Sequence, residues 1–331
     1  PLYGLLALKI RDDKPLRAIA AHARPGQPQA NLILGAVHYL LLGGREHPLA
    51  AHYPSVKPGA KAEGDAFALF QDFCRQYEAE VTKLVASRIT NTNEVARCTS
   101  LYPAFDHIAR ETGSALHMVE IGPSAGLNLN WNNYAYSYLR DGKEAVRRAP
   151  QEALITLQAE LRGPRTPMLS PELPRVASRV GLELNPVNLQ SPEDRLWLRA
   201  LIFPEFSQRF TRLEGAIRTA QAHPVQIRYG NALDLLAPTI QALPPEGTPV
   251  VYHSFVTYQF SGAMKERLDA TLRELSKARP VYRVSVEWDA DKHPLLVSRY
   301  DRGACGKVVL ADCNPHGAWL EWRHDTRAAA E

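Results

Sequence analysis

Regularly spaced cysteines are absent from this sequence of 331 residues. Its four cysteines, Cys74, Cys98, Cys305 and Cys313, form no C-x-x-C pair. This arrangement suits reduced thiols in a cytoplasm better than a disulfide framework. The gap between Cys313 and His316 is typical of a metal-ligand pair, but no further ligand pair accompanies it. No metal site is therefore expected.

Long apolar runs and blocks of charge are absent as well. The longest apolar run, NLILGAVHYLLLGG at 31–44, contains His38 and is too short to span a bilayer. The net charge is +4 with dispersed Arg and Lys, which excludes the basic footprint of a nucleic-acid-binding protein. The opening PLYGLLALKI has no initiator Met and no basic segment, so no signal peptide is predicted there. We expect a cytoplasmic protein with a small-molecule substrate and with neither nucleic acid nor membrane as partner.

Residues 1–112 carry helical patterns throughout, and no strand is predicted before residue 115. A buried helix is predicted in 31–44, and DAFALFQDFCRQYEAEVTKLVASR repeats apolar residues at three- and four-residue steps. The pattern LYPAFDHIARETG ends at Gly113, a usual helix stop. These residues are predicted to form a helical N-terminal cap region.

From residue 113 onward, short apolar runs alternate with helical patterns. Ser191, Pro192 and Asp194 predict a well-capped helix start. An irregular insertion is predicted over about 140–178, which is rich in Pro and Arg. The alternation predicts an α/β fold whose mostly parallel sheet ends in antiparallel strands. The predicted strands are ALHMVEIG, RVGLELNP, VQIRYG, TPVVYHSFV and PVYRVSVEW, followed by the antiparallel HPLLVSRYD, KVVLADCN and AWLEWRH.

The first predicted strand ends in a turn of small residues, EIGPSAG, in which Glu120 is followed by Gly122, Ser124 and Gly126. Glycines allow a sharp turn, and a following helix start offers free N–H groups to a ligand. A G-x-G-x-x-G dinucleotide site and a phosphate-binding loop do not fit this spacing. Three interpretations stay open: a cofactor site, a serine nucleophile, and a turn that serves packing only.

The nucleophile interpretation comes from G-x-S-x-G, the pattern of the α/β-hydrolase elbow, with Ser124 as the nucleophile. Asp234 or Asp289 would supply the acid, and His293 or His316 the base. The elbow normally follows several strands, and none is predicted upstream. Glu120 also has no role in such a triad.

Six stretches of the chain carry a resemblance to a known family: ANLILGAVHYLLLGG, TNEVARC, VEIGPSAGLNLN, LELNP, WLRALIFPE and VVYHSFVTY. In these stretches, which run in the family's order, the chain resembles a bacterial family, domain of unknown function 2332. The family name conveys no activity. Its fold is similar to a class I methyltransferase, and the E-x-G-x-x-x-G turn resembles the first motif of those enzymes.

This resemblance implies a Rossmann-like, methyltransferase-type domain over 113–331 that binds S-adenosylmethionine and methylates a small polar acceptor. It implies roles at the turn and at the ends of the later strands. A serine hydrolase and a non-catalytic nucleotide-binding protein are the alternatives. The implied cofactor-binding residues are Glu120, Gly122, Ser124, Gly126, Glu183 (ribose) and Asn231 (adenine), and the implied catalytic or substrate-orienting residue is His253.

Two further groups are candidates from the sequence itself. The asparagines after the turn, among them Asn128, either line the cofactor pocket or cap and bend this segment. NTNEVARC at 91–98 places Asn93, Glu94 and Arg97 within one helical turn. These three residues either form a capped helix with an ion pair or lie at the cofactor mouth as catalytic groups offered to the substrate.

Overall fold

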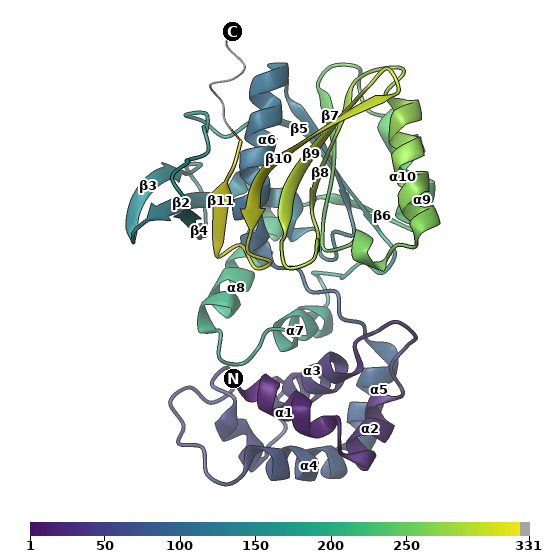
Figure 1. The fold of residues 1–331 in the computed structure, drawn as a ribbon. Coiled ribbons are helices and arrows are strands. Elements are labelled where there is room, and N and C mark those ends of the chain that lie inside the picture. The colour runs from purple at the N-terminus through teal and green to yellow at the C-terminus, as the bar shows by residue number, and fades with distance from the viewer. Residues whose placement is uncertain (325–331) are drawn as a thin grey trace. The chain divides into compact units, whose positions relative to one another are not determined.

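A computed structural model gives the fold of residues 1–324 (Figure 1). The contacts of the chain divide it into two compact units, each treated separately below. Unit 1 comprises residues 1–92 and 187–214, and unit 2 comprises residues 93–186 and the chain from 215 onward. The predicted boundary at residue 112 does not coincide with this division, because residues 93–112 belong to unit 2 and 187–214 to unit 1.

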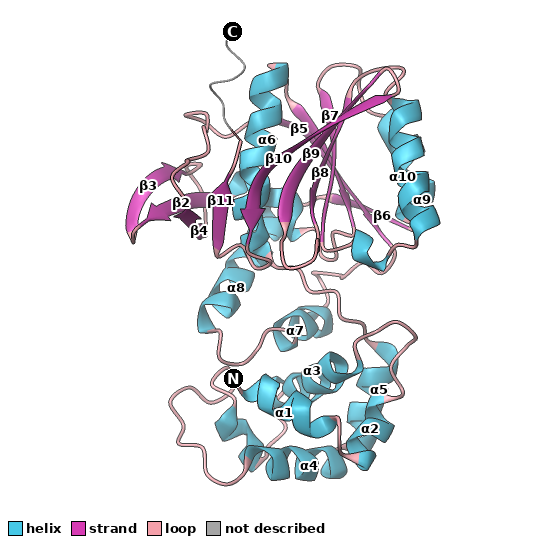
Figure 2. Ribbon diagram, viewed as in Figure 1, coloured by secondary structure: helices cyan, strands magenta, loops and turns pink. Residues whose placement is uncertain are grey.

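Unit 1 contains helices and no strand among its residues (Figure 2). The helical pattern over 65–88 forms two helices, with Tyr77 between them in a non-helical conformation. The capped start at Ser191 is confirmed, since its side chain accepts a hydrogen bond from Asp194 N. The elements are α1 (Leu2–Ile10), α2 (Lys14–Ala20), α3 (Gln29–Leu42), η1 (Pro48–His52), α4 (Ala66–Gln76), α5 (Glu78–Ser87) and α7 (Pro192–Ala200), and α8 (Ser207–Ala222) has residues in both units.

The core of unit 1 surrounds α3, whose residues are apolar on nearly every side. Gly35 faces this contact closely, since a Cβ atom there would lie 3.4 Å from the side chains of Trp197 and Leu201. This close approach brings α7 onto α3 and buries Trp197. The burial of large apolar side chains, each worth about 2 kcal/mol, stabilises the unit.

Unit 2 contains a sheet of eleven strands and the helices that cover it. Gly113 ends α6 in the left-handed conformation, as predicted. The strands are β1 (Leu116–Ile121), β2 (Ala135–Arg140), β3 (Lys143–Arg148), β4 (Thr156–Arg162), β5 (Val176–Glu183), β6 (Gln226–Tyr229), β7 (Thr248–Ser254), β8 (Val281–Val286), β9 (Pro294–Asp301), β10 (Ala304–Cys313) and β11 (Trp319–Trp322), and the helices are η2 (Val95–Arg97), α6 (Cys98–Thr112), η3 (Leu127–Asn133), α9 (Ala232–Gln241), η4 (Thr257–Gln259) and α10 (Gly262–Leu275).

The strands lie in the order β3-β2-β4-β11-β10-β9-β8-β7-β1-β5-β6. The five strands β6-β5-β1-β7-β8 are all parallel, and the predicted antiparallel meander from β8 to β11 is confirmed. Along the chain the sheet grows from β1 to β5 and β6, and then from β7 to β8 on the other side of β1. Strand order therefore reverses between β1 and β7, the place where such sheets usually bind ligands.

The predicted irregular insertion over about 140–178 is wrong in part, because β3 and β4 lie within it. These strands extend the sheet at its far end, where Lys143–Arg148 has almost no buried side chain. A polar edge strand has no apolar alternation from which it could be predicted. The turn after β1 also leads into the 3-10 helix η3 and not into an α-helix.

The two faces of β1 pack against different helices. Val119 and Ile121 belong to an apolar cluster that includes residues of α9 and α10. Glu120 points to the other face, where its neighbour in register is Tyr252 of β7. The ring of Tyr252 lies 5.0 Å from that of Phe105, so this face is covered by α6. The fold thus buries one acidic side chain between the sheet and a helix.

Candidate functional site

The turn after β1 is closed by hydrogen bonds within the protein. Gly122 N donates to Leu182 O over 3.0 Å, and Gly126 N donates to Pro123 O over 2.8 Å. Ser124 N donates to the Glu183 carboxylate over 2.7 Å. Leu127 N donates to Asn93 Oδ1 over 3.0 Å. Four amides that the sequence offered to a cofactor therefore already have partners.

Both glycines of the turn are required by its conformation and its packing. Gly122 has φ +70° and Gly126 has φ +76°, backbone conformations that residues with a side chain rarely adopt. A Cβ atom on Gly122 would lie 2.8 Å from Val256, and one on Gly126 would lie 2.9 Å from Val225. Neighbouring side chains thus fill the space in which the glycines were expected to leave room for a ligand.

Glu183, predicted to bind a ribose, ends β5 and is buried. One carboxylate oxygen accepts the Ser124 amide, and the other accepts Asn185 N over 2.9 Å. Glu183 therefore fixes the turn after the neighbouring strand β1. Sequence reasoning placed this residue at the correct edge of the sheet, although about 60 residues separate it from the turn.

Glu120 is the most perturbed carboxyl group of this edge, with 2% of its surface exposed. Burial raises the pKa of Glu120 to about 8, and the charge of Glu183 adds to this increase. Hydrogen bonds from Tyr252 and Asn128 and the charge of Arg97 oppose it. The Tyr252 hydroxyl donates to Oε2 over 3.0 Å. Glu120 is consequently protonated in much of the population at neutral pH.

Asn128 links Glu120 to a buried thiol. The Cys98 thiol points to Asn128 Oδ1 at 3.5 Å, which leaves the amide group of Asn128 to donate to Glu120. Burial raises the pKa of Cys98 well above its ordinary value, and the charges of Glu120 and Glu94 raise it further. Cys98 is therefore a neutral thiol, not a nucleophile.

The segment Asn93–Arg97 lies beside the turn, as the functional interpretation of NTNEVARC required. Asn93 binds the Leu127 amide, and the Glu94 carboxylate accepts Ala96 N over 3.1 Å. Arg97 donates to Ser254 O at the end of β7, and its guanidinium lies 4.5 Å from the centre of the Phe255 ring. The structure therefore brings these three polar residues to the carboxyl edge of the sheet.

His253 is completely buried, and both ring nitrogens have partners. Arg283 Nε donates to Nε2 over 3.0 Å, so the proton on Nδ1 is donated to Glu287 Oε1 over 2.6 Å. Burial lowers the pKa of His253 below its ordinary value, and the positive charge of Arg283 lowers it further. In this arrangement His253 is a neutral part of a fixed network, and neither nitrogen is available to a substrate.

Glu287, just beyond β8, was not singled out from the sequence. Its Oε1 accepts Val256 N and Thr257 N in addition to the His253 ring, while Oε2 is buried without a hydrogen-bond partner in the described residues. Burial by itself would raise the pKa of Glu287, but the hydrogen bonds from His253 and from the two amides lower it below its ordinary value. The sequence signal that could have identified Glu287 is an acidic residue at the end of a predicted parallel strand.

Phe255 follows β7 and was also missed. Its φ of +54° is unusual for an aromatic residue, and Ser124 after β1 has φ +56°. The Phe255 ring contacts those of Trp288 and His293, and Trp288 is 55% exposed. An aromatic surface beside Arg97 thus borders the edge at which strand order reverses. Strained backbone of this kind is concentrated at functional sites.

The remaining candidate residues lie elsewhere or have structural bonds. Asn231, predicted to bind adenine, is exposed and caps α9, because its Oδ1 accepts a hydrogen bond from Leu233 N over 2.9 Å. Helix capping therefore accounts for this side chain without an adenine ligand. Asp234 pairs with Arg267 at the surface. Asp289 is exposed, and its backbone pairs with that of Lys292. Neither acid pairs with an imidazole in the part of the chain that the structure describes.

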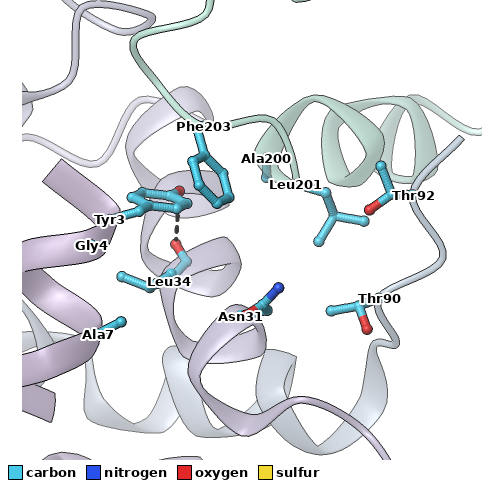
Figure 3. A pocket seen from close by; sticks show the side chains of 10 residues that line it. All are labelled: Tyr3, Gly4, Ala7, Asn31, Leu34, Thr90, Thr92, Ala200, Leu201 and Phe203. Carbon is cyan, nitrogen blue, oxygen red and sulfur yellow. Dashed lines mark hydrogen bonds between the residues drawn. The ribbon is translucent and has the colours of Figure 1, made fainter. Parts of the chain in front are cut away.

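Unit 1 has a small pocket of its own, of about 190 Å³, beside α1 and α3 (Figure 3). Tyr3 stands in its wall and hydrogen-bonds Leu34 O and His38 Nδ1. Burial lowers the pKa of His38 to about 4, so this histidine is neutral. The pocket is mostly apolar, and its polar groups are few, which makes it a less specific candidate than the edge of the sheet.

Residues 1–324 contain no cluster of three or more His, Cys, Asp or Glu side chains that could hold a metal ion. No helix among these residues is long and apolar enough to cross a membrane. All four cysteines are free thiols, and only Cys305 has appreciable exposure.

A sequence model of one protein family matches residues 1–322. The chain belongs to this family, DUF2332, described as an uncharacterized protein conserved in bacteria. Neither curated proteins nor solved structures gave a match. Membership of the family therefore agrees with the resemblance seen in the sequence and assigns no activity.

Proposed function

We propose that unit 2 binds S-adenosylmethionine at the carboxyl edge of its sheet and transfers the methyl group to a small polar acceptor. The observation that supports this proposal is the position of the E-x-G-x-x-x-G turn. It follows β1, the strand next to the reversal in strand order. The order β6-β5-β1-β7-β8 is that of a doubly wound Rossmann-type sheet, in which this turn is the usual ligand site.

The side chains assigned to the cofactor from the sequence do not form an open cradle for it. Glu183 and the amides of the turn are bonded within the protein, and Val256 and Val225 occupy the space beside the glycines. The proposal therefore depends on the topology and the sequence motif. No step of methyl transfer is assigned to these residues, and His253 is not assigned the role of base.

Calorimetric titration tests the proposal with S-adenosylmethionine and S-adenosylhomocysteine as separate ligands. Trp288→Ala removes a half-exposed aromatic side chain from the carboxyl edge, and Leu8→Ala removes an exposed apolar side chain from unit 1 as a control. We expect binding to the unmodified protein and to Leu8→Ala, with weaker binding to Trp288→Ala. Absence of binding by both ligands at millimolar concentration would contradict the proposal.

A serine hydrolase is the second candidate, and the backbone at Ser124 favours it. A nucleophile at a strand-to-helix elbow adopts a strained conformation, and Ser124 has φ +56°. Two observations weigh against it: Ser124 is 4% exposed, and His253, the imidazole on the adjacent strand, is bound to Glu287 and Arg283. Labelling by a fluorophosphonate that is lost in Ser124→Ala would replace the first proposal with this one.

An assay of turnover distinguishes a non-catalytic nucleotide-binding role from the methyltransferase and the hydrolase. A protein that binds the adenosyl ligands but methylates none of a panel of small amines, carboxylic acids and hydroxyl compounds would have this third role. Methyl transfer to any member of the panel, detected by mass spectrometry of the product, would exclude the non-catalytic role.

A further inference from the structure

Unit 2 contains a second pocket, away from the turn after β1 and lined by polar groups. It has a volume of about 380 Å³, within the range of small-molecule sites. It lies between the end of β3 and the beginning of β5, and η3 contributes to its wall. The side chains used below are Asn132, Arg148, Glu172 and Arg175.

The arginines at this pocket have no carboxylate partners. Arg148 and Arg175 line it, and Arg179 donates from Nη2 to Oδ1 of Asn132 over 2.7 Å. None of these three forms an ion pair with an acidic group of residues 1–324, whereas other arginines of the unit, such as Arg110 and Arg273, do. Arg175 is exposed and Arg148 is half-buried, so their unpaired positive charges are open to an anion that enters the pocket.

Arg179 shows this lack of compensation most clearly. Its Nε is buried and has no hydrogen-bond partner in the described structure. Burial lowers the pKa of Arg179, and the phenol of Tyr252 opposes this effect. Asn132 lines the pocket and accepts a hydrogen bond from Arg179, so it connects this cation to the pocket. Because its Oδ1 faces Arg179, the remaining hydrogen-bonding group of Asn132 is the NH₂ donor.

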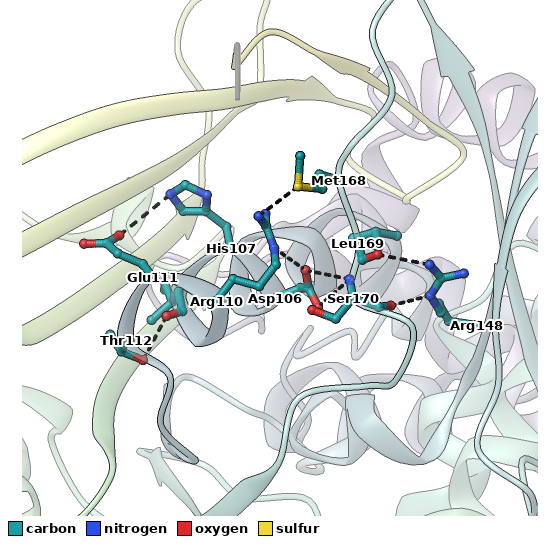
Figure 4. A network of polar contacts seen from close by, with 10 residues as sticks. Asp106, His107, Arg110, Glu111, Thr112, Arg148, Met168, Leu169 and Ser170 are labelled. Carbon is teal, nitrogen blue, oxygen red and sulfur yellow. Dashed lines mark hydrogen bonds and ion pairs between the residues drawn. The ribbon is translucent and has the colours of Figure 1, made fainter. Parts of the chain in front are cut away.

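Arg148 is held in place by a network that links α6 to the loop after β4 (Figure 4). The buried Asp106 accepts Ser170 N over 3.1 Å and Arg110 Nε over 3.0 Å. Arg148 in turn donates to the carbonyl oxygens of Leu169 and Ser170. Carbonyl oxygens orient a guanidinium without neutralising it, so Arg148 is positioned but remains available to an anion.

We propose that this pocket binds a small molecule through an oxyanion group, a phosphate or a carboxylate, held by Arg148, Arg175 and the amide of Asn132. Guanidinium groups match the geometry of both anions and bind them through paired hydrogen bonds. Glu172 also lines the pocket, is exposed and has no ion-pair partner in the described structure. Its charge weakens the site and provides a way to test it.

The experiment is calorimetric titration of the full chain with inorganic phosphate and, separately, with citrate, at matched ionic strength set with chloride. We expect saturable binding of at least one anion. The anion that binds more tightly shows whether the site prefers a phosphate or a carboxylate group. Arg175→Gln should weaken it about tenfold, as expected for a charge-assisted hydrogen bond. Arg17→Gln, an exposed arginine of unit 1 with the same charge change, is the control and should bind as the unmodified protein does.

Two further variants separate a built site from general charge attraction. Glu172→Gln should strengthen binding about threefold, as for a solvent-exposed charge pair. Asn132→Asp should abolish binding while keeping or raising the melting temperature, because it gives Arg179 a carboxylate partner. The proposal is overturned if neither anion binds, if Arg17→Gln weakens binding as much as Arg175→Gln, or if Asn132→Asp binds normally.

Discussion

The turns that follow β1 and β7 have the same design but differ in how completely they are closed. In each turn, a non-glycine residue has a left-handed backbone conformation. A carboxylate at the end of a neighbouring strand, β5 or β8, fixes the backbone of the turn. Glu183 places one oxygen on each of two amides. Glu287 uses Oε1 for two amides and for His253, and leaves Oε2 without a partner in the described residues.

This difference indicates where the edge of the sheet is available to a ligand. The turn after β1 is small, packed and satisfied, although its sequence motif drew attention first. The turn after β7 carries an aromatic side chain, lies against Arg97 and borders the exposed Trp288. The glycine motif therefore located the candidate edge of the sheet, while the side chains with exposed surface belong to the neighbouring turn after β7.

The largest expected effect is that of Gly122→Ala in the turn after β1. The substitution forces a side chain into a left-handed position, 2.8 Å from Val256, and should reduce the free energy of unfolding by about 3 kcal/mol. Gly142→Ala is the matched control, since Gly142 has φ +73° with no atom near its Cβ position, and should lose about 1 kcal/mol. Urea denaturation measures both. Partial rescue of Gly122→Ala by Val256→Ala is expected, and no rescue would show that packing is not the cause.

The second effect concerns Glu120 and has the opposite sign. Its pKa is raised, so the folded state retains a proton that the unfolded state releases, and stability falls as pH rises from about 4.5 to about 8. Glu120→Gln removes this penalty and should be more stable than the unmodified protein by about 2 kcal/mol at pH 6, since each pH unit above 4.5 adds about 1.4 kcal/mol. The advantage should disappear below pH 4.5. Melting temperatures across this range test the prediction, which fails if the two proteins differ equally at every pH.

A smaller effect is expected for Glu287→Gln in the turn after β7. The neutral amide accepts the Val256, Thr257 and His253 donors more weakly, and about 1.5 kcal/mol should be lost at pH 7. Because the pKa of Glu287 is lowered, its contribution is present above the unfolded pKa and is lost as pH falls through the folded value. The difference from the unmodified protein should therefore shrink in acid. Chemical denaturation at several pH values measures it, and a constant difference would exclude the charge as the cause.

The smallest effect is that of Ser124→Gly. Glycine relieves the left-handed strain at φ +56° but increases the entropy of the unfolded chain, so a net stabilisation of about 0.5 kcal/mol is expected. Calorimetric melting resolves a change of this size. A clear destabilisation would show that the Ser124 side chain holds the turn together, which its sequence position does not predict.

Most of the parallel sheet was predictable because its strands are buried on both faces and form short apolar runs. The meander from β8 to β11 was predictable from alternation, and the helix starting at Pro192 from its caps. The strand β3 was not predictable, because this polar edge strand has little apolar pattern. The strand β4 does alternate, with Leu157, Ala159 and Leu161 buried, and the prediction of an irregular insertion overlooked this pattern. The division into units was also hidden, since residues 187–214 join a core formed by the first 92 residues.

At the candidate site, the sequence located Glu120, the glycine turn and the segment from Asn93 to Arg97, and it placed Glu183 at the same edge. It did not reveal that Val256 fills the turn or that Arg283 and Glu287 engage His253, because these contacts join segments far apart in the chain. Local composition determined the positions of turns, caps and buried strands, since those depend on neighbouring residues. Only the tertiary structure decided which polar groups are satisfied and which remain available, because hydrogen-bond partners and burial arise when distant segments pack together.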